Sequence, residues 1–103
     1  MRNLEKYVEQ SGVFEGTIVT RQLSKGGFIN YCLRNIKCDD NTKIRHMWNH
    51  FKKSVEKQIM PYVEEGINQH INIKFEAKAY EYTRKDGTKD YALKIDKILK
   101  ISK

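Results

Sequence analysis

A strict alternation of apolar and polar residues over positions 71–80 is the feature that most constrains the fold of this chain. The odd positions are apolar, and they are Ile71, Ile73, Phe75, Ala77 and Ala79. Successive side chains of a β-strand point to opposite faces, so the alternation predicts a strand with one buried face. A single strand is not stable alone, and the rest of the chain must supply its partners.

The N-terminal part of the chain predicts a β-hairpin. Apolar residues recur with a period of two over 13–23, and Gly16 within this run predicts a bulge or bend. Residues 24–27 (SKGG) are typical of a hairpin turn, and 28–38 then form the second strand. The preceding residues, 1–12, predict an N-terminal arm or a short helix.

A second hairpin is predicted at the C-terminal end. Residues 84–87 (RKDG) carry an Asp-Gly turn, after which the alternation resumes. The apolar positions change parity at Ile98, which predicts a bulge near 96–97. The lysines in this region recur every third residue, a spacing that alternates faces on a regular strand, so we expect no single row from Lys94, Lys97, Lys100 and Lys103.

The segment between the hairpins permits two interpretations. Either a turn at 38–42 leads into a short strand over 43–47 and a helix over 49–59, or a helix begins directly after the turn. We favour the first, with Pro61 helping to end the helix. The apolar neighbours of Trp48 favour a core position for its ring, and the alternative is an exposed anchor for a protein partner.

The predicted order is a β-meander, a helix and a β-hairpin, so we expect a mostly β protein with one helix. This order is that of an OB-like barrel, a partly open five-stranded structure whose face and loops bind oligonucleotides. We expect residues 13–103 to form this single domain. A fold alone does not establish a function.

Composition indicates the class of partner. The chain has a net charge of +7, six tyrosines, four phenylalanines and one tryptophan. Basic residues on phosphates release counterions, and aromatic rings among them suit stacking on bases. Tyr80 and Tyr82 have the alternative role of pairing across the hairpin. The candidate nucleic-acid-binding residues are Arg21, Lys25, Tyr31, Arg34, Lys74, Lys78, Tyr80, Tyr82, Arg84, Lys85 and Lys89.

No cluster typical of an enzyme is recognisable. His46 and His50 have the spacing of a helical zinc pair, but Asn49 stands where the protease motif has glutamate. Asp39 and Asp40 could hold magnesium as a carboxylate pair, but acidic residues are also common in turns, which is the simpler interpretation. Cys32 is typical of a small core residue. We expect no catalysis, metal, cofactor or small-molecule substrate.

The sequence also indicates a compartment. No apolar run reaches the length of a signal peptide or a membrane span. The two cysteines, Cys32 and Cys38, have no second pair and no zinc spacing. We therefore expect a cytoplasmic protein with reduced thiols and no membrane contact.

Three stretches resemble a family of small OB-like proteins from mobile genetic elements. They are FEGTIV at 14–19, KIRHMW at 43–48 and INIKFEAKAYEYTRKDGTKDYALKIDKI at 71–98. More narrowly, the chain is similar to the middle proteins of the replication operon in the staphylococcal cassette chromosome, which accompany an A-family DNA polymerase and enable it to start primers. The resemblance implies an accessory, non-catalytic subunit with a DNA polymerase as partner. It implies no residue roles.

The leading hypothesis is a single-stranded DNA-binding accessory module that docks onto a replication enzyme and supports primer synthesis. The alternative is a pure protein–protein interaction subunit whose basic face meets an acidic patch. A third, weaker hypothesis is a small metal-dependent nuclease that uses Asp39, Asp40 and the histidines.

Overall fold

The computed structural model describes residues 2–38 and 41–103, which are mostly β-strand with one α-helix. Two short 3-10 helices complete the described part of the chain. In chain order the elements are η1 (Arg2–Tyr7), β1 (Gly12–Leu23), β2 (Ile29–Cys38), β3 (Lys43–Asn49), α1 (Lys53–Ile59), η2 (Met60–Tyr62), β4 (Asn68–Thr83) and β5 (Lys89–Ser102). The predicted order of strands, helix and hairpin is therefore confirmed.

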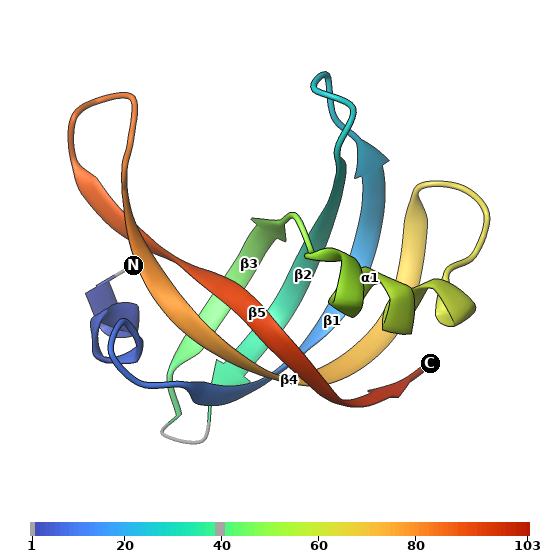
Figure 1. The fold of residues 1–103 in the computed structure, drawn as a ribbon, viewed down its shortest axis with the longest axis horizontal. Coiled ribbons are helices and arrows are strands. Elements are labelled where there is room, and N and C mark those ends of the chain that lie inside the picture. Colours follow the sequence, from blue (N-terminus) through green and yellow to red (C-terminus); the bar gives the residue numbers. More distant parts are fainter. Residues whose placement is uncertain (1, 39–40) are drawn as a thin grey trace.

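The five strands form one antiparallel sheet in the order β3-β2-β1-β4-β5. The long β4–β5 ribbon crosses in front of β1, β2 and β3, so the sheet folds over on itself (Figure 1). β3 and β5 remain its two edges, and the sheet is not closed into a barrel. The short helices η1 and α1 lie toward opposite ends of the long axis (Figure 1).

The core fills the space inside this folded sheet. The alternation in β4 is confirmed, because every odd position from 69 to 79 is buried. The rings of Phe14 and Phe75 stack across β1 and β4, with centroids 5.7 Å apart. From η1, Leu4 and Tyr7 are buried in the same cluster, as is Val55 of α1. Burial of these apolar side chains against the strands thus holds the short helices onto the sheet.

The predicted bend in β1 is confirmed at Gly16. The pairing with β2 shifts register between Glu15 and Thr17, on either side of the glycine. A Cβ atom at this position would lie only 3.1 Å from Cγ1 of Ile36. The lack of a side chain therefore allows β1 to bend closely against β2 while it pairs with β4 on its other side.

Both predicted hairpin turns are present. Gly27 has φ of +81° and Gly87 has φ of +88°, a conformation that a residue with a Cβ rarely adopts. The backbone N–H of Ser24 donates to the carbonyl of Phe28, and that of Arg84 donates to the carbonyl of Thr88. These bonds close the two turns at the positions that the glycines predict.

β5 contains two bulges, of which the sequence predicted one. Neither Asp96 nor Leu99 has a direct partner on β4, and the register shifts at each. Each bulge adds one residue to β5 that has no partner on β4. Lysines three positions apart on β5 therefore lie opposite residues two positions apart on β4. The prediction that the lysines alternate faces is therefore wrong. Their partners on β4 share one face: Lys94 lies opposite Lys78, Lys97 opposite Glu76 and Lys100 opposite Lys74.

The middle segment differs from the prediction at its boundary. β3 continues to Asn49, and α1 begins at Lys53 rather than at Asn49. The reason is cross-strand pairing, since Trp48 and Asn49 still lie opposite residues of β2. α1 ends just before η2, which contains Pro61, as predicted. In the described part of the chain, no helix has the length and apolar character needed to cross a membrane.

Candidate nucleic-acid interface

The outward face of β2 and β3 carries an exposed aromatic residue. Tyr31 and Leu33 of β2 point into the core, so the residues beside them in the strand, Cys32 and Arg34, lie on the opposite face. Arg34 is exposed there, whereas Cys32 is buried. Trp48 lies directly opposite Cys32, and His46 lies opposite Arg34. The Trp48 side chain is 50% exposed, so the predicted core position is wrong.

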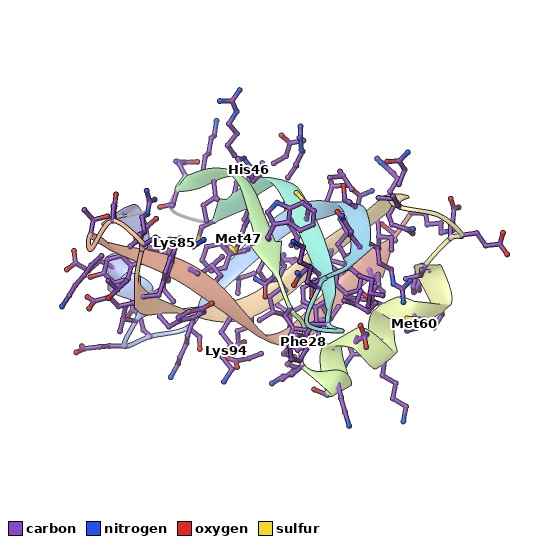
Figure 2. All side chains as sticks on the ribbon, turned by 90° about the horizontal axis from the view of Figure 1, so that it is seen from above. Phe28, His46, Met47, Met60, Lys85 and Lys94 are labelled. Carbon is purple, nitrogen blue, oxygen red and sulfur yellow. The ribbon has the colours of Figure 1, made fainter. Side chains whose placement is uncertain are left out.

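Trp48 lies at the edge of a groove between β3 and the β4–β5 ribbon. This groove, called the aromatic groove below, has a volume of about 620 Å³. Figure 2 shows His46 pointing outward from β3, with Met47 on the side of β3 toward the ribbon. The side chains that line the groove include His46, Trp48, Tyr80, Tyr82, Arg84 and Tyr91. The fold thus brings together aromatic residues that are 30 or more positions apart in the sequence.

Tyr80 and Tyr82 form one wall of the aromatic groove. Both side chains are exposed, and their ring centroids lie 6.4 Å apart at an angle of 52°. Their positions on β4 place them on the same side of the strand. With the Trp48 ring on the opposite wall, the groove presents flat apolar surfaces on two sides.

The buried carboxylate of Asp90 fixes the side chains of Tyr82 and Arg84 in this wall. Asp90 lies opposite Tyr82 in the β4–β5 register and is 6% exposed. The Tyr82 hydroxyl donates to its Oδ2 at 3.3 Å, and Nε of Arg84 donates to the same oxygen at 3.1 Å. The Arg84 guanidinium is therefore fixed beside Asp90, which partly neutralises its charge.

Tyr31, a predicted stacking residue, is instead part of the core. Its side chain is fully buried, and its ring stacks on Phe51 at a centroid distance of 4.4 Å. Its hydroxyl donates to Glu56 at 2.9 Å and accepts from Nε of Arg21 at 3.2 Å. A nucleic-acid base cannot reach this ring, so the prediction for Tyr31 is wrong.

The environment of Tyr31 also keeps its hydroxyl protonated. Burial raises the pKa of Tyr31, and Glu56 raises it further, whereas the Arg21 guanidinium lowers it. The net direction is upward, because an ionised phenol would lose its hydration. The Tyr31–Glu56 hydrogen bond therefore ties α1 to β2. The Arg21 side chain, predicted to bind nucleic acid, donates to the same Tyr31 hydroxyl.

The other predicted residues fall into three places. Of the predicted set, Tyr80, Tyr82 and Arg84 line the aromatic groove. Four basic residues outside the lining are exposed: Lys25 and Lys85 in the two hairpin loops, Lys89 at the start of β5, and Arg34 on β2. Of these, Arg34 lies opposite the lining residue His46. Lys89 is 3.3 Å from Glu81, which offsets part of its charge. Lys74 and Lys78 lie farther along the outward face of β4, outside the groove.

Sequence reasoning missed Trp48 and His46 as groove residues. Strand alternation carried past position 47 was the available signal, because it places 46 and 48 on the face opposite Met47. Trp48 also lines a second hollow of about 260 Å³, together with Leu23, Ser24 and Asn30 at the base of the β1–β2 hairpin. The exposed ring of Phe28, in that hairpin, lies 4.9 Å from the His50 ring. Exposed aromatic surface thus continues from the groove toward the first hairpin.

The candidate metal ligands are not brought together. Asp39 and Asp40 lie outside the described residues. His46 is on β3, and His50 follows that strand beside Phe28 rather than one helical turn away from His46. Among residues 2–38 and 41–103, no three His, Cys, Asp or Glu side chains are grouped closely enough to hold a metal ion.

Comparison with known proteins adds no family. No protein-family model matches the chain, and no protein of curated function matches its sequence.

Proposed function

We propose that this chain is a non-catalytic accessory module that binds single-stranded DNA in the aromatic groove and supports primer synthesis by a DNA polymerase. The observation that carries the proposal is the placement of Trp48, Tyr80 and Tyr82, all exposed, around one groove. Proteins that bind single strands without sequence preference combine such rings with basic residues along the strand.

We infer that the folded sheet is a form of the OB-like barrel. The strand order, the antiparallel pairing and a helix between β3 and β4 support this assignment. The two edge strands also approach each other, because the Asn49 side chain donates to the Leu93 carbonyl at 3.0 Å. In OB-folds, oligonucleotides bind on the face of the second and third strands, between the two hairpin loops. Trp48 and Arg34 are on that face here.

Binding in this groove would be sequence-tolerant. Each base stacked on an aromatic side chain contributes about 1–3 kcal/mol, because every base has a flat face. The exposed side chains of Arg34, Lys25 and Lys85 would contact phosphates, so the affinity would decrease with rising salt concentration.

Polymerase docking is proposed on the sequence resemblance to replication accessory proteins of mobile elements. We assign catalysis to that partner, with the complex acting in the cytoplasm. The second candidate function is protein–protein interaction without DNA affinity. It is favoured by Leu23 and Phe28, which are 65% and 56% exposed at the first hairpin, because exposed apolar and aromatic side chains are typical of partner surfaces.

The direct test is a titration of labelled oligo-dT with wild-type protein, Trp48→Ala, Tyr80→Ala and the control Ile67→Ala. Ile67 is 57% exposed but lies outside the groove. Both groove variants should stay folded and bind more weakly by about 1–3 kcal/mol, whereas the control should bind like wild type. No binding by wild-type protein at low salt, combined with co-purification with a polymerase, would establish the second candidate instead.

A further inference from the structure

The outward face of the β4–β5 ribbon carries lysines on both strands. We call this set the lysine ladder, and it comprises Lys74, Lys78, Lys94, Lys97 and Lys100. All five side chains are exposed, and the two bulges in β5 align its three members with the outward positions of β4. Lys94 projects away from the ribbon in Figure 2.

The arrangement of the lysine ladder is unfavourable in the isolated protein. Lys74 lies directly opposite Lys100, and Lys78 lies directly opposite Lys94. Like charges at directly opposite positions destabilise a sheet. A face that serves only solubility mixes both signs. Between these two pairs the ribbon adds Glu76 opposite Lys97, and β1 adds Glu15 opposite Lys74, so lysines outnumber carboxylates by five to two. The concentrated positive charge is therefore complementary to a polyanion.

The lysine ladder is continuous with the aromatic groove. Tyr80 and Tyr82 are the next outward positions of β4 after Lys78, and alternate residues of a strand lie about 6.8 Å apart. At the far end, Lys74 and Lys100 line a polar hollow of about 340 Å³ together with Lys37 of β2 and Glu15 of β1. A chain of phosphates leaving the groove at Tyr80 would therefore meet lysines at each following step.

We propose that the lysine ladder binds the phosphate backbone of the same single strand beyond the bases stacked in the aromatic groove. This inference rests on the proposed function, and it extends the DNA footprint from the groove to the outward face of β4 and β5. The outward positions from 74 to 78 offer no aromatic ring for stacking. Contact there is through charge alone, so the ladder adds length-dependent and salt-dependent affinity without base preference.

The test compares oligo-dT of about four nucleotides with oligo-dT of about sixteen, the range of footprints of single OB-folds. The variant is Lys94→Gln/Lys100→Gln, which removes one lysine from each opposed pair. The matched control is Lys53→Gln/Lys57→Gln, which removes the same charge from exposed positions of α1. All four substitutions are at exposed side chains, and thermal melting checks that both variants fold.

For the longer oligonucleotide, the ladder variant should lower the slope of log affinity against log salt by about 1.4, because each lost phosphate contact removes about 0.7. For the shorter one, it should behave like the control. If the ladder and control variants behave alike with the longer oligonucleotide, the lysine ladder does not bind DNA, and its partner would instead be an acidic protein surface. The aromatic groove would be unaffected by that result. Failure of wild-type protein to bind either oligonucleotide would overturn the groove as well.

Discussion

At the scale of single residues, the burial of Tyr31 and Trp48 is the reverse of what the sequence predicts, which is an accessible Tyr31 and a core Trp48. Tyr31 packs on Phe51 inside the core, and Trp48 is half exposed on β3. Strand alternation carried past position 47 places Trp48 outward, but the apolar residues on both sides of Trp48 fit a helical face equally well. The pairing of β3 with β2 decides between the two, and this pairing is a long-range property of the sheet.

The protonated hydroxyl of Tyr31 gives a prediction for alkaline pH. Its pKa is raised in the folded protein, so the unfolded chain ionises this phenol first, near its ordinary value of about 10. The stabilisation is complete below that pH and is lost as the pH rises above it. Thermal melting from pH 8 to 11 should show a steeper loss of stability for wild-type protein than for Tyr31→Phe. The same pH dependence in both proteins would contradict the assignment.

At the scale of elements, the strands were predictable from alternation, and the turns from Gly27 and Gly87. The first bulge of β5 was also predictable, because Ile98 changes parity. The second bulge, at Leu99, could be placed only with the register against β4 in hand. That register aligns the lysines on one face. The aromatic groove was unpredictable for the same reason, since it brings Trp48 of β3 beside Tyr80 of the ribbon, 32 positions later.

The docking of η1 gives a prediction about packing. Leu4 is fully buried, whereas Val8 just after η1 is 40% exposed. Leu4→Ala removes buried methyl groups and leaves a cavity, so it should lower the free energy of unfolding by about 2–5 kcal/mol. Val8→Ala is the control and should change it much less. Urea denaturation measures both, and an equal effect of the two variants would show that η1 is not packed onto the sheet.

At the scale of the whole molecule, excess charge gathers on the outward face of β4–β5 instead of being evenly mixed. The free protein should be destabilised by the two opposed lysine pairs. Lys94→Gln/Lys100→Gln is therefore expected to raise stability at low salt by about 0.2–1 kcal/mol per pair. The gain should vanish near 1 M salt, where charges are screened within about 3 Å. Melting temperatures at both salt concentrations test this, and a lower melting temperature of the variant at low salt would refute it.

We propose that single-stranded DNA stacks on Trp48 in the aromatic groove. Trp48 is the single tryptophan of the chain, so intrinsic fluorescence reports on this position alone. Titration of wild-type protein with unlabelled oligo-dT at several salt concentrations is the most direct measurement. We expect saturable quenching of the fluorescence, with an affinity that falls steeply as salt increases. Unchanged fluorescence at low salt, at oligonucleotide concentrations well above the micromolar range, would show that single-stranded DNA does not bind at Trp48.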